Sequence, residues 1–561
     1  MRDHAGAAAS NMYDYVIVGA GSAGCVLANR LSEDGASVLL LEAGKWDRDP
    51  LIHIPIGIGK IFPQRMHDWG YFMEPDPGID ARGIECARGK VVGGSSSINV
   101  MAYVRGHRSD FDRWAANELD GWSYRDVLPY FRRGEAWEDG ADAYRGGDGP
   151  LRVQRSRYSD PILEAFIGAG RQAGYSETPD YNGADQEGFG LIQSTIHRGR
   201  RCSAATAYLR PALSRRNLTV LVAATVARVL FDEDRASGIA YRHRGRDKVA
   251  LARREVILCA GVIDTPKLLM LSGIGDPDEL ANHGIPVKVA NHGVGKNFQD
   301  HLSVMVTYRR RDRGPFEGAM RYDRLAGAMV SSFLGMESFA GDVPIGVTAF
   351  LKTRPEVKAP DVQLIFLAAP MPARAWFRPF ITPVADSFGC RVALLRPESR
   401  GAVKLASADP SAAPLIIPNF LTTQADRDTL REGLKIVREV VGQSDMTAHS
   451  AGEIAPGEAL TTDEQLDAFI RKTSVTVHHP AGTCRMGGAS DRDRVVDPQL
   501  RVCGVKGLRV VDASVMPDMV GGNINAVVMM IAEKAADMIL GKPADFPPPS
   551  PSRQEDAHVS P

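Results

Sequence analysis

A glycine-rich turn near the start of the chain limits the possible folds more than any other feature. The apolar run Tyr13 to Val18 leads directly into Gly19-Ala20-Gly21-Ser22-Ala23-Gly24, and a helical composition follows from Ser22 to Leu31. A second apolar run, Ser37 to Leu41, completes a strand–helix–strand unit of about thirty residues. In such units the first glycine forms the turn, the second lets the backbone approach a pyrophosphate, and the third lets helix pack on strand. The pattern therefore predicts a dinucleotide bound at the N-terminus of the helix.

The residue at the end of the second apolar run narrows the choice of dinucleotide. Glu42 follows Gly24 by 18 positions. A carboxylate at this point accepts hydrogen bonds from ribose hydroxyls and repels a 2′-phosphate. The expected ligand is therefore FAD or NAD, and the alternative is a plain structural turn followed by a surface glutamate.

A second glycine-rich stretch, Gly89 to Asn99, contains the adjacent pair Gly93 and Gly94 followed by three serines. Its backbone N–H groups and hydroxyls can surround a pyrophosphate or a polar ring edge. A flexible loop is the alternative interpretation of such a tract. The flanking apolar residues and Asn99 favour a ligand-binding loop.

The C-terminal part carries candidates for acid–base chemistry. His479 precedes a Pro-Ala-Gly turn, which would hold it on a fixed backbone, as a general base requires. We expect its neighbour His478 to point the opposite way on an extended segment. Asn523 and Asn525 lie just before the final helix, expected over Ala526 to Leu540, where they could cap the helix or face the ligand.

The middle of the chain differs in pattern from both ends. From His301 to about Leu460, apolar and polar residues alternate, which favours an antiparallel sheet in a separate, inserted domain. Strands are expected there at Val362 to Leu367 and Arg391 to Leu395. Two more buried strands, Arg254 to Cys259 and Leu508 to Val511, are expected to join the nucleotide-binding sheet.

Together these motifs resemble the glucose–methanol–choline (GMC) oxidoreductases, FAD enzymes that oxidise alcohols. The resemblance extends from Tyr13 to Leu540, and it departs from the family pattern at Val262, where a small residue such as Ala is usual. The stretches that carry it, besides the first glycine turn, are Gly89 to Gly106, Gly261 to Gly275, Gly293 to His301 and Arg396 to Gly401.

The resemblance implies roles for individual residues. It makes His479 the catalytic base and Asn523 the second catalytic residue, and it places Asn525 near the flavin. Ile98 stands beside Asn99 where some members carry a histidine that attaches the cofactor, which implies non-covalent FAD. The expected cofactor-binding residues are Gly19, Gly21, Ser22, Ala23, Gly24, Glu42, Ala43, Val92, Gly94, Ser95, Asn99, Val100, Val226, Asp512, Ala513, Asn523 and Asn525; no metal site is expected.

The expected fold class is α/β, with a Rossmann-like FAD-binding domain and an inserted α+β substrate domain built on an antiparallel sheet. The FAD-binding domain is expected in three parts, residues 12–160, 201–300 and 461–541. The substrate domain would combine 161–200 with 301–460, and residues 542–561, which are rich in Pro and Ser, would form a disordered tail.

The expected reaction is oxidation of a primary alcohol to an aldehyde by hydride transfer to the flavin. Electrons would pass to a quinone-like or other acceptor. The alternatives are an oxygen-dependent oxidase producing hydrogen peroxide, a flavin-dependent lyase on the same fold, and a non-catalytic FAD-binding protein. The segment Phe333 to Phe380, with Phe339, Phe350, Trp376 and Phe377, is the expected pocket lining for an apolar alcohol.

Composition excludes several other classes of partner. Charged residues make up 24% of the chain and the net charge is -1, which argues against nucleic acid as a partner. No run approaches ~20 apolar residues, so no membrane span is expected. The seven scattered cysteines are typical of reduced thiols in a cytoplasmic protein rather than a zinc site. Peripheral association with the inner membrane, homo-oligomerisation and the choice between Met1 and Met12 as start are left open.

Overall fold

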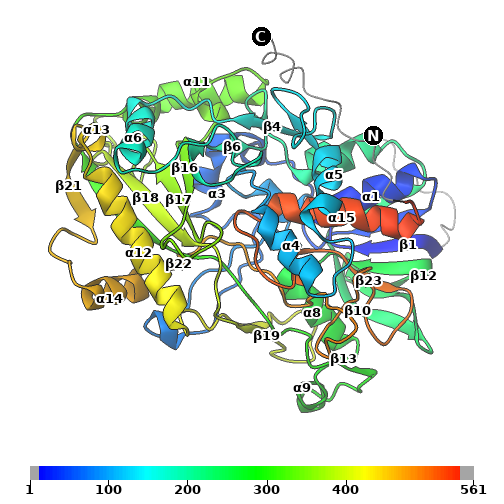
Figure 1. The fold of residues 1–561 in the computed structure, drawn as a ribbon. Helices are drawn as coiled ribbons and strands as arrows, with labels where there is room; N and C mark the ends of the chain where they lie inside the picture. Colours follow the sequence, from blue (N-terminus) through cyan, green and yellow to red (C-terminus); the bar gives the residue numbers. More distant parts are fainter. Residues whose placement is uncertain (1–11, 544–561) are drawn as a thin grey trace, which may run out of the picture.

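The computed structural model describes residues 12–543. The predicted disordered tail, apart from its first two residues, lies outside this range. A seven-stranded sheet at one end of the molecule holds the glycine turn (Figure 1). Its strand order is β10 (Ala224–Asp232), β11 (Arg235–His243), β12 (Arg246–Leu258), β1 (Met12–Val18), β2 (Val38–Leu41) and β9 (Leu218–Leu221), with β23 (Leu508–Val510) also paired to β12.

The strands around the glycine turn are parallel. Val16 on β1 lies opposite Leu39 on β2 and Val256 on β12, and both pairings are parallel. All three side chains are buried, as expected for strands covered on both faces. Helices α1 (Ser22–Glu33) and α15 (Asn525–Leu540) lie side by side against this sheet in Figure 1. The first and last segments of the chain therefore meet at the turn.

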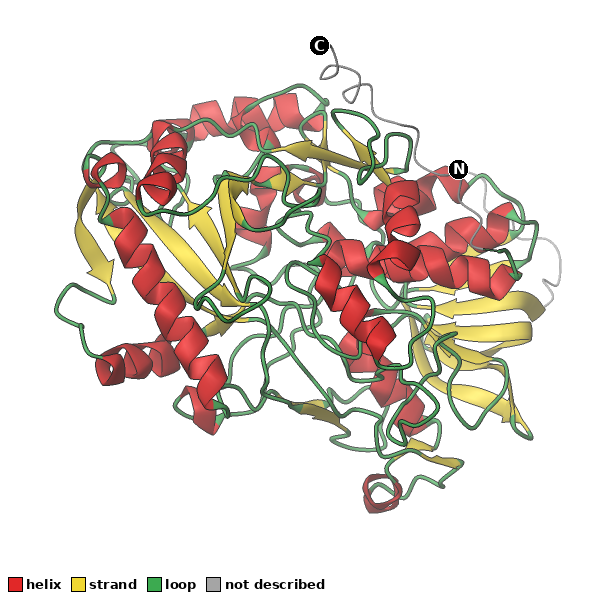
Figure 2. Cartoon of the chain, viewed as in Figure 1, coloured by secondary structure: helices red, strands yellow, loops and turns green. Residues whose placement is uncertain are grey.

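A second sheet, entirely antiparallel, occupies the other end of the molecule (Figure 2). Helix α12 (Gln424–Val441) packs on one face so closely that a Cβ on Gly433 would lie 2.5 Å from Cγ1 of Val392. The opposite face turns towards the first sheet. The strand order is β21 (Ser450–Ala455), β15 (Leu302–Arg310), β18 (Ser387–Leu394), β17 (Val362–Leu367), β16 (Val347–Leu351) and β5 (Gly188–Leu191), with β22 (Val475–Thr476) also on β15.

The predicted fold class is confirmed, since a mixed sheet with parallel strands around the glycine turn and a separate antiparallel sheet form one α/β structure. The strand expected at Val362 to Leu367 is β17 with the same limits, and the final helix begins one residue earlier than expected, at Asn525. β5 joins the second sheet from the stretch assigned to residues 161–200. The domain limits themselves stay a prediction.

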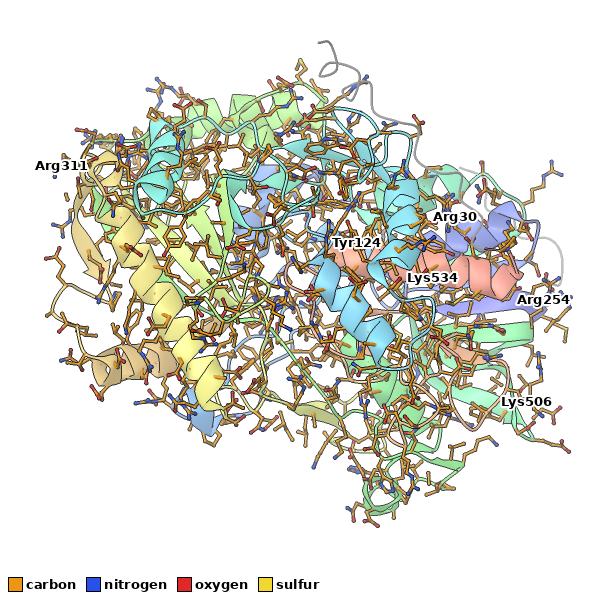
Figure 3. All side chains as sticks on the ribbon, in the orientation of Figure 1. Arg30, Tyr124, Arg254, Arg311, Lys506 and Lys534 are labelled. Atoms are coloured by element: carbon orange, nitrogen blue, oxygen red, sulfur yellow. The ribbon has the colours of Figure 1, made fainter. Side chains whose placement is uncertain are left out.

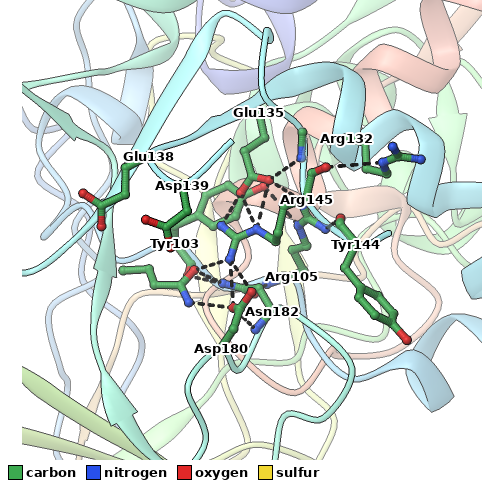
Figure 4. A network of polar contacts seen from close by, with 12 residues as sticks. Tyr103, Arg105, Arg132, Glu135, Glu138, Asp139, Tyr144, Arg145, Asp180 and Asn182 are labelled. Carbon is green, nitrogen blue, oxygen red and sulfur yellow. Dashed lines mark hydrogen bonds and ion pairs between the residues drawn. The ribbon is translucent and has the colours of Figure 1, made fainter. Parts of the chain in front are cut away.

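A buried network of charges joins the segments that run between the two sheets (Figure 4). The Glu135 carboxylate is fully buried at the start of β3 (Glu135–Trp137) and pairs with Arg105 and Arg145. Arg145 also donates to Asp180 at 2.8 Å and to Gln193 at 2.9 Å. Each buried charge thus has opposite partners, which offsets its desolvation.

Candidate active site

A large cavity, about 1400 Å³, lies between the two sheets. The glycine turn, the serine-rich loop and the start of α15 form its wall on the first sheet. β17, β18 and the segment around His479 line it on the other side. Such a volume exceeds what a drug-sized ligand usually occupies and leaves room for a dinucleotide together with a small substrate.

Each glycine of the first turn has a separate structural reason. Gly19 has φ +101°, and a Cβ there would lie 2.4 Å from the carbonyl oxygen of Cys259. A Cβ on Gly24 would lie 1.9 Å from the carbonyl oxygen of Gly19, so this glycine allows helix and strand to pack. A Cβ on Gly21 would meet nothing within 4 Å, because this residue faces the cavity. The open space over Gly21, at the N-terminus of α1, fits a pyrophosphate.

Glu42 is buried at the end of β2 and also lines the cavity, so it is not a surface residue. Its carboxylate accepts the N–H groups of Ala20 at 2.9 Å and Gly44 at 2.8 Å. Burial raises the pKa of Glu42 to about 7, although the two N–H donors act in the opposite direction. Glu42 therefore holds the glycine turn in place and presents an acceptor beside it.

The serine-rich loop is held by contacts and is not a flexible tract. A Cβ on Gly94 would lie 2.7 Å from Cα of Gly21, so the two glycine loops touch through their backbones. Arg201 donates to Oδ1 of Asn99 at 2.8 Å. At the start of α15, Asn525 accepts a hydrogen bond from the Ser22 hydroxyl at 2.7 Å.

Most of the predicted cofactor-binding residues line this cavity. Gly24 and Val92 are the two that do not, because both pack behind the lining in the backbone turns. Those on the lining are Gly19, Gly21, Ser22, Ala23, Glu42, Ala43, Gly94, Ser95, Asn99, Val100, Val226, Asp512, Ala513, Asn523 and Asn525.

The two predicted catalytic residues are in direct contact. Nδ2 of Asn523 lies 3.0 Å from Nε2 of His479. The His479 backbone N–H donates to Asp300 at 2.9 Å, which fixes the histidine against β15. Nδ1 of His479 lies 3.1 Å from Nδ1 of His301, the residue just before that strand.

The hydrogen bonds around His301 determine which nitrogen of His479 carries the proton. Nε2 of His301 lies 3.1 Å from the carbonyl oxygen of Leu395, which can only accept, so Nε2 carries hydrogen. Nδ1 of neutral His301 is then an acceptor, and Nδ1 of His479 must donate to it. Nε2 of His479 consequently carries no proton, and its lone pair accepts the Nδ2–H of Asn523.

The Asn523 amide is also oriented by its neighbours. Gln363 on β17 donates to Oδ1 of Asn523 at 3.4 Å and to the Thr348 hydroxyl at 3.1 Å. This leaves Nδ2 of Asn523 as the group that faces His479. The residue at the N-cap of α15 is Ile524, and it makes no side-chain cap bond, so the expected alternative of a helix cap does not apply to either asparagine.

Three histidines in this cluster are neutral at pH 7. Burial holds the pKa of His479 well below its usual value, and the neighbouring His301 and Arg88 act in the same direction. Burial also lowers the pKa of His301 to about 4 and that of His478 to about 3. A neutral imidazole with a lone pair on Nε2 can accept a proton from a hydroxyl placed in the cavity.

The prediction of an extended backbone at His478 is wrong. His478 has φ +64°, a left-handed conformation, and does not lie on an extended segment. Its Nδ1 accepts the Ala87 N–H at 3.2 Å, and its ring meets Phe62 edge-on at 5.2 Å. Both histidines reach the cavity, but the positive φ turns His478 towards a different wall.

The four aromatic residues expected in the pocket do not line it. Phe350 packs against Tyr181 with ring centres 5.3 Å apart, and the Trp376 ring donates to the Glu317 carbonyl at 2.7 Å. Phe339 and Phe377 are also absent from the lining. Aliphatic residues replace them near the catalytic pair, namely Met305, Ile365, Leu367, Val475 and Val477.

Sequence reasoning assigned no role to His301, Gln363 or Arg391, which the second sheet brings to the cluster. His301 could have been found, because it ends the family-like segment that begins at Gly293 and follows Asp300 directly. Gln363 and Arg391 lie inside predicted strands and carry no motif of their own.

Two general properties of the described residues, 12–543, concern metals and membranes. This part of the chain contains no group of three or more His, Cys, Asp or Glu side chains arranged to hold a metal ion. None of its helices combines the length and the apolar character needed to cross a membrane. The seven cysteines are all free thiols.

Comparison with known proteins gives consistent matches over almost the whole chain. The GMC oxidoreductase family models match residues 13–303 and 397–532. The chain is 44% identical to human mitochondrial choline dehydrogenase, covering 96% of this chain and 92% of the relative. It is 43% identical to the oxygen-dependent choline dehydrogenase of Rhizobium etli, covering 94% and 96%.

Solved structures of the same kind also match. Pyridoxine 4-oxidase from Mesorbium loti superposes with a TM-score of 0.83 at 32% identity, over 93% of this chain and 98% of that one. An Aspergillus oryzae formate oxidase variant gives a TM-score of 0.86 at 28% identity, over 96% and 99%.

Proposed function

The chain belongs to the GMC oxidoreductases, a family of FAD-dependent enzymes, and we propose that it oxidises a primary alcohol to an aldehyde as a dehydrogenase. The observation that carries this proposal is the pair His479 and Asn523, which face each other across 3.0 Å inside the cavity. The pair has one proton acceptor and one amide donor, the two groups that an alcohol hydroxyl needs.

The proposed roles follow from these hydrogen bonds. The alcohol O–H donates to Nε2 of His479, and the alcohol oxygen accepts from Nδ2 of Asn523. His479 then takes the hydroxyl proton while Asn523 holds the oxygen in place, which is a contribution of orientation. His301 acts through His479 as a positioning residue, because it keeps the proton on Nδ1.

The residues on the first sheet fit FAD. The open space at Gly21 would take the pyrophosphate, and Glu42 would accept from the ribose hydroxyls. When bound, FAD supplies the acceptor for the hydride that leaves the alcohol carbon. Ile98 and Asn99 replace an attachment histidine, so acid precipitation should release all flavin into solution. Flavin remaining on the washed precipitate would contradict non-covalent binding.

An oxidase is the second candidate. Its support is that two structural relatives are named oxidases and a sequence relative is named oxygen-dependent. Acceptor exchange tests the choice: the purified flavoprotein is assayed over a panel of alcohols with a quinone or dye, and then with oxygen alone. A dehydrogenase turns over only with the dye or quinone, whereas an oxidase forms one hydrogen peroxide per alcohol.

The same assay separates the proposal from the lyase and from a non-catalytic FAD-binding protein. A lyase would convert its substrate without reducing an acceptor, and a binding protein would reduce none. Flavin-loaded Asn523→Ala should lose turnover in part, because the oxygen loses its donor while the base remains. Full activity of this variant would contradict the role of Asn523. A cytoplasmic location stays a prediction.

A further inference from the structure

The antiparallel sheet presents a single cation to the cavity. Arg391 lies on β18, and its register partners Met305 on β15 and Ile365 on β17 line the cavity beside it. Directly opposite residues share one face of a sheet, so the three side chains form a row across neighbouring strands. By contrast, the labelled Arg254 and Arg311 extend outward from the margins of the molecule (Figure 3).

The guanidinium of Arg391 is held in a fixed position. Its Nη1 donates to the Ser303 hydroxyl at 2.9 Å, and that hydroxyl donates to the Val475 carbonyl at 2.9 Å. Ser303 lies on β15, two residues beyond His301 and so about 7 Å further along the extended chain. The cation is therefore set at a defined separation from the catalytic cluster.

Arg391 has no counter-charge. Burial lowers the pKa of Arg391, and no carboxylate of the described residues opposes this shift or pairs with the guanidinium. Arg391 is partly buried, and a desolvated charge without an opposite charge beside it is unfavourable, so an anionic ligand would offset this cost. Its remaining N–H donors form a planar fork that matches a carboxylate.

The acidic residues on the cavity lining are all engaged elsewhere. They are Glu42, Asp264 and Asp512. Glu42 accepts from the glycine turn, and Asp264 accepts from the Tyr71 hydroxyl at 2.8 Å. Asp512 accepts the Gly261 N–H at 2.9 Å. No carboxylate lines the cavity on the strands of the second sheet, so Arg391 is the charge that this sheet gives the substrate end, beside the aliphatic side chains of Met305 and Ile365.

We infer that Arg391 binds an anionic group of the substrate, and that the enzyme oxidises an aliphatic hydroxy acid in which a carboxylate lies some carbons from the hydroxyl. This inference rests on the proposed function, since it places the hydroxyl at His479. The aliphatic residues around Arg391, Met305 and Ile365 among them, contact the chain between the two polar ends.

The same charge acts against a quaternary ammonium alcohol such as choline, the substrate in the names of the two sequence relatives. Two like charges inside one cavity repel each other, and a separation of about 7 Å at an effective dielectric constant of about 20 would weaken binding roughly 50-fold. An aromatic face could offset this repulsion. Trp69 on the lining already stacks on Tyr71 and has Nζ of Lys90 4.2 Å from its ring centre. Of the other rings on the lining, Phe62 meets His478 edge-on, Phe316 meets Phe339, and Tyr322 is exposed.

The test compares 6-hydroxyhexanoate, 1-hexanol and choline as substrates of the purified flavoprotein. The wild type should give the highest kcat/KM with the hydroxy acid and the lowest with choline. Arg391→Met should lower kcat/KM for the hydroxy acid about 10- to 100-fold relative to 1-hexanol, chiefly through KM, because a charge-assisted contact is lost. For Arg391→Lys, kcat/KM for the hydroxy acid should lie between the wild-type and Arg391→Met values, since lysine keeps the charge but lacks the planar fork of donors.

The matched control is Arg309→Met. Arg309 is an exposed arginine on the same face of β15, four residues beyond Met305 and outside the cavity lining, so its loss should keep the substrate ratio. A second readout needs no turnover: hexanoate should perturb the flavin absorbance of the oxidised wild type and not that of Arg391→Met.

Three results would decide the matter. An unchanged ratio of hydroxy acid to hexanol in Arg391→Met, or choline as the best wild-type substrate, overturns the inference while alcohol oxidation stands. Failure to oxidise any alcohol overturns the proposed function instead. In that case the hexanoate titration still decides whether Arg391 binds a carboxylate.

Discussion

Replacing His301 by leucine tests the chain of hydrogen bonds that keeps the proton off Nε2 of His479. His301 accepts from Nδ1 of His479 at 3.1 Å and donates to the Leu395 carbonyl at 3.1 Å. Leucine removes the acceptor without introducing a charge. His479 then either keeps an unpaired buried N–H or moves its proton to Nε2, where it can no longer act as base.

Both outcomes raise the barrier by a calculable amount. Leaving a buried donor unpaired costs about 1–3 kcal/mol, which corresponds to about 5- to 150-fold in rate or equilibrium. If the proton moves to Nε2 of His479 instead, the fraction of enzyme that can act as base falls by no more than the same factor, because beyond that point the unpaired form would be the more stable one. We therefore expect His301→Leu to lower kcat/KM for alcohol oxidation about 5- to 150-fold with flavin content unchanged, because the residue contacts none of the glycine turn.

Steady-state kinetics on flavin-loaded protein measure this loss. His301→Gln should recover part of it, since an amide again offers an acceptor and a donor, whereas a purely structural defect would not respond to hydrogen-bonding capacity. Wild-type kcat/KM in His301→Leu, or equal losses in the leucine and glutamine variants, would refute the reasoning.

The remaining predictions concern the base, the cofactor site and stability. His479→Ala should lower kcat about 10²- to 10⁴-fold while keeping its flavin, and His478→Ala should cost much less; the reverse order would mean that the base is misassigned. Wild-type kcat/KM should rise only below the ordinary histidine pKa of about 6.5 and stay level above it, because burial lowers the pKa of His479 and keeps it neutral there; a rising limb above pH 7 would contradict this. Glu42→Arg should weaken FAD affinity about 10- to 100-fold through loss of a charge-assisted bond, with less loss in Glu42→Gln; equal flavin occupancy after dialysis would exclude Glu42 as a ligand. Glu135→Ala leaves the buried Arg105 without a carboxylate partner and Arg145 with Asp180 alone, so it should lower the free energy of unfolding by about 3–5 kcal/mol in denaturant titrations, whereas Glu138→Ala, nearby but partly exposed, should change it little; similar effects of the two would show that the buried network adds no stability.

Local patterns predicted the parts of the site that are formed by residues close together in the sequence. The turn at Gly19 to Gly24 and the carboxylate of Glu42 follow from one strand–helix–strand unit. They could be placed without knowing the rest of the fold. His479 and Asn523 came from the family resemblance, which carries tertiary information that one sequence lacks.

The residues that were missed come from contacts between distant segments. Arg391 and Gln363 reach the cavity because the second sheet packs with that face towards the first, and strand periodicity does not say which face is inward. The same ambiguity explains why aromatic residues such as Phe350 were expected on the lining and instead lie in the core. The left-handed backbone of His478 has no sequence signal, because the residue is not a glycine.

The contact between Asn523 and His479 crosses the boundary between the two halves of the molecule. The His479 segment follows β22 of the antiparallel sheet, whereas Asn523 precedes α15, which lies against the sheet that carries the glycine turn. A relative shift of about 1 Å would break a hydrogen bond of this length without touching the turn. The catalytic pair is therefore complete only while the halves are docked. On gentle warming, alcohol turnover should fall before flavin dissociates, and it should recover on cooling.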